Sequence, residues 1–253
     1  MNKLLRLLCL APVCYFAAPG LAAADSAPVY ELRIYYTHPG KMPNLLTRFR
    51  DHTCKIFEKH GMVNVGYWIP VKAEDQDKLY YVLKHASRDA AKASWAAFGA
   101  DPEWKAVRDA SEAAGKIVAK VDTVFLAATD YSPAVPTLTG PHIYELRTYT
   151  TNEGKLDTLD ARFRDHTVAL FAKHGMTNVL YTHPTDADKG AGKTLVYFLA
   201  HASTDAAKAS FDAFRTDPDW LKARDASEAA GKLLIEGGVK SVFLTPTDFS
   251  LLK

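Results

Sequence analysis

A strict alternation of apolar and polar residues marks the first ordered element of the chain. Its two faces would carry Tyr30, Leu32 and Ile34 on one side, and Val29, Glu31, Arg33 and Tyr35 on the other. A period of two residues is typical of a β-strand, because successive side chains point to opposite faces of a sheet. The pattern therefore predicts a strand over residues 29–35.

The pattern then changes to helical spacing. Leu46, Phe49, Thr53 and Ile56 recur every three or four residues, which predicts a helix over about residues 42–60. Gly61 follows the last turn, where a left-handed helix cap favours a residue without a side chain.

The following residues complete one β-α-β-β-α-β unit. Strands are predicted over residues 62–68, 79–85 and 121–126, with a helical region that begins at Ser87 between the last two. Asp101 and Pro102 restart this helix, since Asp is a good cap and Pro is tolerated at the first helical position. This order of elements is that of the ferredoxin-like fold.

The whole unit occurs twice. Residues 48–53 (RFRDHT) recur letter for letter as residues 162–167, and residues 108–116 recur as residues 224–232. Helices cover one face of a ferredoxin-like sheet, and the other face must pack against something. We therefore predict an α+β fold in which two ferredoxin-like β-α-β-β-α-β repeats form an intrachain dimeric α+β barrel. The predicted parts of the chain are a signal peptide (1–24), a first domain (25–132), a proline-containing linker (133–141) and a second domain (142–253).

Several short motifs, present in both copies, resemble the NIPSNAP family. In the first copy they are Tyr30-Glu31-Leu32-Arg33, Pro39-Gly40-Lys41, Phe49-Arg50-Asp51-His52, Lys59-His60-Gly61 and Asp101-Pro102-Glu103-Trp104. The resemblance covers nearly all of the chain after residue 24. It implies a dimeric α+β barrel, related in fold to small cofactor-free monooxygenases and to haem-binding barrels, and it implies no particular activity. The role of mitochondrial members in mitophagy is not carried over to an exported protein.

The amino terminus has the pattern of a secretory signal peptide. Lys3 and Arg6 precede an apolar run, and small residues at 22–24 predict cleavage after Ala24. The apolar run is short for a membrane span and contains prolines. We therefore expect an exported protein, periplasmic or secreted, with no stable membrane anchor after cleavage.

Cleavage would change the charge and the cysteine content. The formal net charge would fall from +2 to 0 (2 − 2) with the loss of Lys3 and Arg6. A neutral protein has no general electrostatic attraction for nucleic acid, so no nucleic-acid partner is expected. Cys54 would be the one remaining cysteine, and Val168 at the equivalent position favours an inert thiol.

Glu31 and Arg33 share one strand face, and Glu145 and Arg147 repeat the arrangement. If the helices cover the opposite face, these charges point into the barrel, where burial demands pairing. One interpretation is a structural ion pair where the two sheets meet. The other is a polar cavity for an acidic or hydroxylated ligand, with arginine as a fork-shaped donor and Tyr35, Tyr81, Tyr149 and Tyr197 along the wall.

His52 and His166 belong to the repeated six-residue motif. The spacing of Leu159, Phe163, His166 and Leu170 places His166 on or beside an apolar helix stripe, which favours a structural histidine. The alternatives are a general base or a metal ligand, and a haem-binding barrel would use one of them as its haem ligand.

Motifs for several chemistries are missing from the sequence. HExxH, GxGxxG, GxxxxGK[ST] and GxSxG do not occur, so zinc-protease, dinucleotide, P-loop and serine-hydrolase sites are disfavoured. We expect no metal site and no cofactor.

The favoured function is a non-catalytic module that binds a small ligand or a protein partner. The alternatives are a cofactor-independent oxygenase or isomerase that uses the barrel cavity, and a haem-binding barrel. The candidate ligand-binding residues are Glu31, Arg33, Tyr35, His52, Glu145, Arg147, Tyr149 and His166.

Overall fold

The computed structural model describes residues 27–138 and 140–253. The proposed signal peptide and its cleavage site lie outside these residues. The elements of the first repeat are β1 (Val29–Thr37), α1 (Met42–Arg48), the π-helix η1 (Phe49–Thr53), α2 (Cys54–Lys59), β2 (Val63–Pro70), the 3₁₀-helix η2 (Ala73–Asp75), β3 (Lys78–His85), α3 (Arg88–Ala100), α4 (Pro102–Ser111) and β4 (Val118–Ala128).

The second repeat has the same elements in the same order. They are β5 (Ile143–Thr151), α5 (Leu156–Arg162), the π-helix η3 (Phe163–Thr167), α6 (Val168–Lys173), β6 (Thr177–Pro184), the 3₁₀-helix η4 (Ala187–Lys189), β7 (Thr194–His201), α7 (Thr204–Thr216), α8 (Pro218–Ser227) and β8 (Leu234–Pro246). The β-α-β-β-α-β order predicted from the sequence is confirmed in both halves. Local sequence explains the helix starts, because Ser87 accepts a hydrogen bond from the Ala90 amide (3.0 Å) and Asp101 accepts one from the Glu103 amide (2.8 Å).

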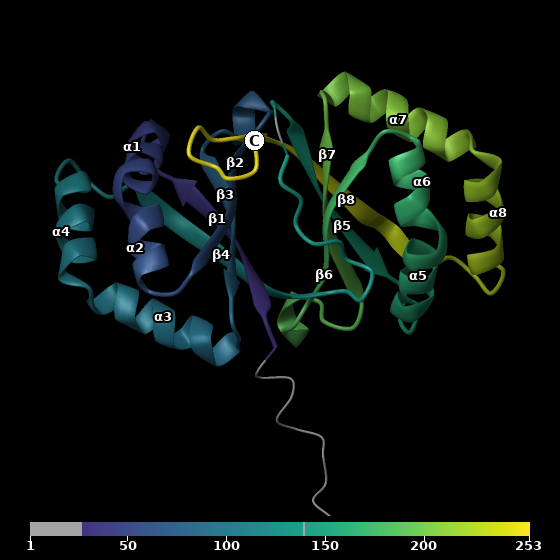
Figure 1. Cartoon of the computed structure of the whole chain (residues 1–253), viewed down its shortest axis with the longest axis horizontal. Coiled ribbons are helices and arrows are strands. Elements are labelled where there is room, and N and C mark those ends of the chain that lie inside the picture. The colour runs from purple at the N-terminus through teal and green to yellow at the C-terminus, as the bar shows by residue number, and fades with distance from the viewer. Residues whose placement is uncertain (1–26, 139) are drawn as a thin grey trace, which may run out of the picture.

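The strands form one closed antiparallel barrel in the order β1-β3-β2-β8-β5-β7-β6-β4. Each repeat supplies four neighbouring strands. The barrel closes where β2 pairs with β8 and where β4 pairs with β6. The helices of the two repeats lie at opposite ends of the molecule, outside the barrel (Figure 1). The predicted intrachain α+β barrel is thus confirmed.

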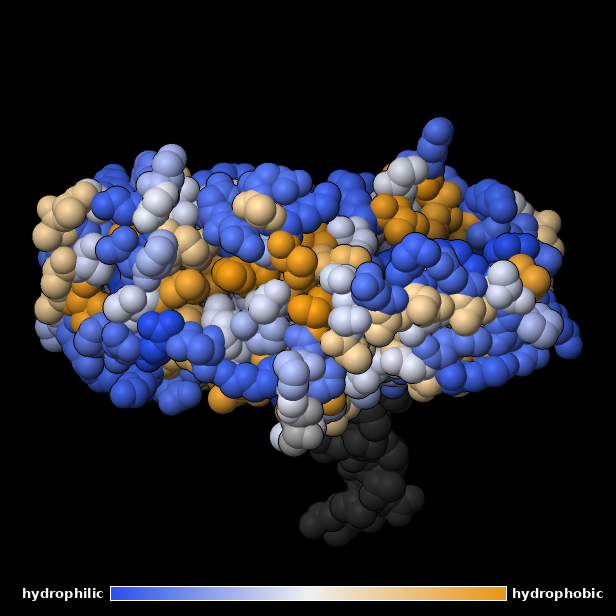
Figure 2. Space-filling model, turned by 90° about the horizontal axis from the view of Figure 1, so that it is seen from above, coloured by the Kyte–Doolittle hydropathy of each residue, from blue (hydrophilic) through white to orange (hydrophobic). Residues whose placement is uncertain are grey.

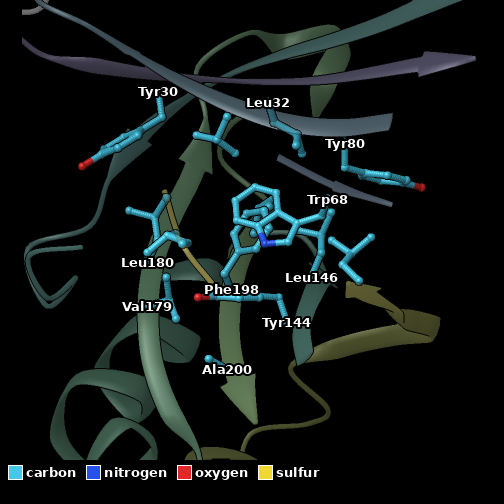
Figure 3. Packing of buried hydrophobic residues seen from close by; sticks show 14 of the residues in the cluster. Tyr30, Leu32, Trp68, Tyr80, Tyr144, Leu146, Val179, Leu180, Phe198 and Ala200 are labelled. Carbon is cyan, nitrogen blue, oxygen red and sulfur yellow. The ribbon is translucent and has the colours of Figure 1, made fainter. Parts of the chain in front are cut away.

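The barrel interior is filled by apolar and aromatic side chains from both repeats. Tyr30, Leu32, Trp68, Tyr144 and Phe198 belong to this cluster (Figure 3). The ring centroid of Trp68 lies 5.4 Å from that of Tyr144 and 5.4 Å from that of Phe198. The interior is a packed core that joins the two repeats, so the expectation of a polar cavity inside the barrel is wrong.

The two faces of β1 are therefore reversed relative to the sequence-based expectation. Tyr30 and Leu32 point into the barrel, and Glu31 and Arg33 point outward to the helices. The reason is hydrogen bonding. A barrel interior closed on all sides by apolar side chains offers a carboxylate no donors, whereas the helix layer supplies Trp95 from α3.

Each helix layer has its own apolar core. In the first repeat, Leu45, Phe49, Phe57 and Tyr81 are among the side chains between the helices and the outer face of the sheet, and the second repeat has an equivalent cluster. Seen from above, hydrophobic residues gather over the middle of the molecule, with hydrophilic residues around them (Figure 2). None of the described helices combines the length and the apolar character that a membrane crossing requires.

Candidate functional site

Glu31 is the centre of a buried polar cluster between β1, β3 and α3. Its carboxylate accepts hydrogen bonds from Arg33 Nη1 (2.6 Å) and Trp95 Nε1 (2.7 Å), and it lies 2.8 Å from His85 Nε2. Burial raises the pKa of Glu31, but the hydrogen bond from His85, the charge of Arg33 and the hydrogen bond from Trp95 outweigh it and leave the pKa below its usual value. Glu31 is therefore an ionised carboxylate whose partners are all part of the protein.

Arg33 lies at the edge of this cluster. Its side chain is 17% exposed, compared with 1% for Glu31. The guanidinium carbon lies 4.2 Å from the ring centroid of Trp95 and 5.6 Å from that of Tyr35. This stacking orients the guanidinium and replaces part of its hydration.

The second repeat contains the same cluster with more internal bonds. Arg147 bonds to Glu145, and it also donates to the hydroxyls of Tyr197 (Nε, 2.9 Å) and Tyr149 (Nη2, 3.1 Å). His201 Nε2 lies 3.1 Å from Glu145, and Ser241 donates to the same carboxylate. Phe211 stands in the place of Trp95, and the Arg147 guanidinium lies 4.5 Å from its ring centroid.

The first repeat leaves two of the equivalent groups unpaired. Arg33 Nε and the Tyr81 hydroxyl are buried without a hydrogen-bond partner among the described residues. The tyrosines that were expected to line a barrel cavity thus lie on the helix side of the sheet. The candidate residues Glu31, Arg33 and Tyr35 come together in one cluster, as do Glu145, Arg147 and Tyr149. A ligand-binding role for these six residues stays a prediction.

His52 and His166 lie apart from these clusters, and both are exposed. The expectation that they are core histidines is wrong. The repeated RFRDHT motif ends in a π-helical turn, η1 or η3, which has an extra residue compared with an α-helical turn. Residues in and after that turn are rotated relative to an ideal α-helix, and the buried positions become Phe49 and Thr53.

A groove of about 640 Å³ lies between α1 and α4 at the outer end of the first repeat. Its lining residues are Pro43, Asn44, Thr47, Arg48, His52, Ala106, Val107, Ala110 and Ser111. Four of the lining residues are apolar and five are polar or charged, so the groove offers both apolar contacts and hydrogen-bonding groups to a small molecule. His52 is the one sequence-predicted site residue among them.

Arg48 is the buried charge in this groove. Its Nη1 donates to Ser111 Oγ (3.3 Å) and to Glu112 Oε1 (3.0 Å), and its guanidinium carbon lies 5.3 Å from the ring centroid of Trp104. Its Nε is buried and has no hydrogen-bond partner in the described part of the chain. Its Nη2 makes no hydrogen bond to the described residues, so this nitrogen is the donor left for a carboxylate in the groove.

The second repeat has a groove that is displaced toward α6 and shares only part of the equivalent lining. It measures about 390 Å³, and its lining residues are Asp165, His166, Ala169, Leu170, Asp219, Lys222, Ala223 and Ala226. Lys222 replaces Ala106, and the groove is not lined by Arg162, the counterpart of Arg48. Of these two grooves, that of the first repeat reaches a buried arginine and that of the second does not.

Sequence reasoning missed Arg48, Ser111 and Glu112 as a group. The signal was present, because Arg48 lies in one run that is identical in the two repeats and the other two residues lie in another. Both runs keep their charged residues in the two repeats. A contact between the two runs in the folded protein could have been suspected from this. Trp95 gave no such signal, since the second repeat has Phe211 at that position.

The sequence matches the family model named NIPSNAP over residues 30–133 and 144–251. These two segments correspond to the two halves of the barrel. The chain belongs to the NIPSNAP family. The resemblance drawn from the short motifs is thereby confirmed. A search of curated proteins gave no match.

Two solved structures of low sequence identity share the fold of the whole barrel. A "putative monooxygenase" from Fusobacterium nucleatum subsp. nucleatum is 10% identical, with a TM-score of 0.58 over 87% of this chain and 93% of its own. An "anthrone oxidase-like protein" is 14% identical, with a TM-score of 0.53 over 91% of this chain and 96% of its own. A NIPSNAP family protein from Agrobacterium tumefaciens strain C58 is 22% identical and covers 42% of this chain and 97% of its own, with a TM-score of 0.37.

Proposed function

We propose that this NIPSNAP protein is a non-catalytic binding protein whose first repeat holds a small organic anion in the groove between α1 and α4. One observation carries the proposal: the groove is lined by Arg48, a buried arginine that bonds to protein acceptors through Nη1 and leaves Nη2 without a partner among the described residues. An unpaired donor on a buried side chain is costly, and a carboxylate that accepts from it removes that cost. The ion pair of Arg48 with Glu112 (3.0 Å) is partly screened by solvent, because the Glu112 side chain is 24% exposed.

The other lining residues define the class of ligand. Pro43, Ala106, Val107 and Ala110 offer apolar walls, and Asn44, Ser111 and His52 add polar groups. This lining fits an amphiphilic acid that has an apolar body and one carboxylate. The volume of about 640 Å³ is within the range of small-molecule sites.

Native mass spectrometry of the purified full chain, followed by titration calorimetry with aromatic and aliphatic carboxylates, tests the proposal. The key variant is Arg48→Met, which keeps a long side chain and removes the donors. The matched control is Arg162→Met, because Arg162 has the equivalent contacts, with Ser227 (3.2 Å) and Glu228 (3.5 Å), but does not line the groove of its repeat. We expect Arg48→Met to lose binding at least tenfold and Arg162→Met to keep it. Equal effects of the two changes would overturn the proposal.

A second pair of variants leaves the arginines in place. Ala110 lines the first groove and Ala226 lines the second, and both are exposed. Ala110→Trp should block the first groove and abolish binding at little cost in stability, whereas Ala226→Trp should have no effect on affinity. Full affinity in Ala110→Trp would place the ligand elsewhere.

A cofactor-independent oxygenase is the second candidate function. It is favoured by the two full-length fold relatives named above, and its site would be Arg33, Tyr35 and Tyr81. Against it, burial raises the pKa of Tyr81 well above its usual value, and Glu31 is already occupied by its own partners. Oxygen consumption by the purified protein with an anthrone as substrate tests this function, and no consumption above buffer would exclude it for that substrate class.

Two further sequence-based hypotheses have direct tests. Haem binding through His52 or His166 predicts a coloured protein, which a visible absorbance spectrum detects. Export with cleavage after Ala24 predicts a mature protein that begins at Asp25, which intact-mass analysis of the protein isolated from the periplasm or medium measures.

A further inference from the structure

A pocket of about 540 Å³ lies at the end of the barrel where β1 begins, away from the groove between α1 and α4. It is bounded by β1, β2 and β3 on one side and by residues 134–137 and 251–252 on the other, and we call it the mouth pocket. Its apolar walls are Val63, Val65, Val135, Pro136, Leu251 and Leu252. Val63 is 56% exposed and Leu251 is 66% exposed, so the walls offer an aliphatic surface that a bound molecule could cover.

Two hydrogen-bond donors line the mouth pocket, the hydroxyl of Tyr30 and the ammonium group of Lys84. The Tyr30 ring packs in the barrel cluster, and its hydroxyl points away from Trp68 and bonds to none of the described residues (Figure 3). The Lys84 side chain is exposed, and its Nζ lies 5.8 Å from the ring centroid of Tyr30 without an acidic partner in the described ranges. An ammonium group has no acceptor, so this pair of groups favours an anionic acceptor.

The second repeat shows what a tyrosine at this position binds. Tyr144, the counterpart of Tyr30, is buried, and its hydroxyl donates to the carbonyl oxygen of Lys253 (3.1 Å). His142 Nδ1 lies 3.0 Å from the same oxygen. The neighbouring Leu252 packs its side chain into the barrel cluster. The chain thus presents a carbonyl oxygen next to an aliphatic group to Tyr144, whereas the hydroxyl of Tyr30 faces the mouth pocket.

The two repeats also differ in charge at this position. Lys84 of β3 lies directly opposite Tyr30 of β1 and Val63 of β2. Its counterpart in the same register is Ala200, which lies opposite Tyr144 and is buried in the barrel cluster. The repeat in which the tyrosine hydroxyl has no protein acceptor is therefore the one that adds a positive charge beside it.

We propose that the mouth pocket binds an aliphatic carboxylic acid, with the carboxylate on Tyr30 and Lys84 and the hydrocarbon chain along Val63, Val65 and Leu251. A carboxylate has two acceptor oxygens and can accept from both donors. Branched aliphatic walls contact a methylene chain without any polar group to satisfy. The volume is within the range of small-molecule sites.

The protonation state of Tyr30 is consistent with this role. Burial raises the pKa of Tyr30, because the charged form would lose hydration. The hydroxyl therefore keeps its proton at neutral pH and can donate it to a carboxylate.

Decanoate, with 1-decanol as its uncharged counterpart, tests the proposal in the full chain that carries Ala110→Trp. This change closes the groove between α1 and α4, so the result does not depend on the function proposed for that groove. The methyl NMR signals of Val63, Val65 and Leu251 should shift saturably with decanoate and more weakly with decanol. No shift with decanoate, or equal affinity for the acid and the alcohol, would overturn the proposal.

Variants of Lys84 complete the test in the same background. Lys84→Ala introduces the residue of the second repeat and should lower the affinity for decanoate about threefold to tenfold, as expected for the loss of a charged donor at a partly exposed site. Lys84→Arg keeps the charge and should keep most of the affinity. The control is Lys92→Ala, because Lys92 is exposed on α3 and does not line the mouth pocket. Undiminished affinity in Lys84→Ala, or an equal loss in Lys92→Ala, would contradict the proposal.

Discussion

The hydroxyl of Thr53 donates a hydrogen bond to the carbonyl oxygen of Arg48, five residues earlier, at 3.1 Å. Thr167 makes the same bond to Arg162, also at 3.1 Å. A π-helical turn breaks the regular ladder of backbone bonds, and in both repeats a buried threonine supplies a donor for a carbonyl group of that turn. The threonine that ends the RFRDHT motif therefore has a structural role in both repeats, because its hydroxyl bonds to a carbonyl group at the π-helical turn. The same bond helps to position the buried Arg48 beside the groove.

Thr53→Val should destabilise the protein by about 0.5–1.5 kcal/mol, because the hydrogen bond from the hydroxyl to the Arg48 carbonyl is lost while the shape of the side chain is kept. Thr47→Val is the matched control, since Thr47 is an exposed, β-branched residue of the same helical segment. Its effect should stay within about 0.5 kcal/mol. Urea unfolding followed by circular dichroism measures both. Equal effects would mean that the hydroxyl of Thr53 does not stabilise the turn.

His52→Gln and His166→Gln should each change the free energy of unfolding by no more than about 0.5 kcal/mol, because both side chains are exposed. The two variants should differ in binding. His52 lines the groove that reaches Arg48, so only His52→Gln is expected to weaken a carboxylate ligand. Thermal melts and calorimetry on the same samples separate the two effects. A loss of several degrees in melting temperature would restore the structural interpretation of these histidines.

The order of the elements could be predicted from the sequence because strand and helix periods are local properties. Alternation placed β1, and apolar spacing placed the helix that contains Phe49 and Ile56. The position of His166 could not be predicted in this way. Its spacing fits a regular α-helix, and the π turn that rotates it outward leaves no mark on hydrophobic periodicity.

The sequence of β1 alone does not show which of its two faces lies inside the barrel, because this depends on the other repeat. Both faces of residues 29–35 contain large side chains, and only the closure of the barrel shows that Tyr30 and Leu32 are enclosed. Residues 129–132 and 247–250 could have been recognised from the sequence as equivalent segments, because Thr129, Asp130 and Ser132 are repeated as Thr247, Asp248 and Ser250. Their crossing to the opposite repeat depends on tertiary pairing that no local pattern encodes.

Removal of Glu31 and removal of Arg33 should lower the free energy of unfolding by different amounts. Glu31→Leu should cost about 3–5 kcal/mol, because Arg33, His85 and Trp95 all lose their acceptor in a buried site. Arg33→Ala should cost less, about 1–3 kcal/mol, since Glu31 keeps two partners and Arg33 reaches solvent. Urea melts of both variants, with Glu145→Leu for comparison, measure this order. A larger cost for Arg33→Ala would contradict the assignment of Glu31 as the centre.

The same cluster should contribute to stability in a defined pH range. The pKa of Glu31 is lowered in the folded protein, so its contribution is present above the pKa of a free glutamate and is lost as the pH falls through the folded value. The cost of Glu31→Leu should therefore shrink on acidification below about pH 4.5. A cost that stays constant down to acid unfolding would show that the charge is not what stabilises the site.

A half-length chain should not remain a folded monomer. Residues 25–134 alone leave β2 without β8 and β4 without β6, and they expose the apolar inner face of the sheet, including Tyr30, Leu32 and Trp68. We expect a dimer that rebuilds the barrel, or aggregation. Light scattering coupled to size-exclusion chromatography measures the mass. A stable, soluble monomer would contradict the account of the intrachain barrel.

The central claim is that one of the two grooves binds organic anions through Arg48 and the other does not. Alanine-methyl NMR tests it most directly, because Ala106 and Ala110 line the first groove and Ala226 lines the second. Benzoate and octanoate would be titrated against the full chain, with benzamide and octanamide as uncharged controls. The account predicts saturable shifts of the Ala106 and Ala110 methyl signals with the carboxylates, weaker shifts with the amides, and a stationary Ala226 signal. Equal shifts with acids and amides, equal shifts at Ala226, or no shift at Ala106 and Ala110 would contradict it.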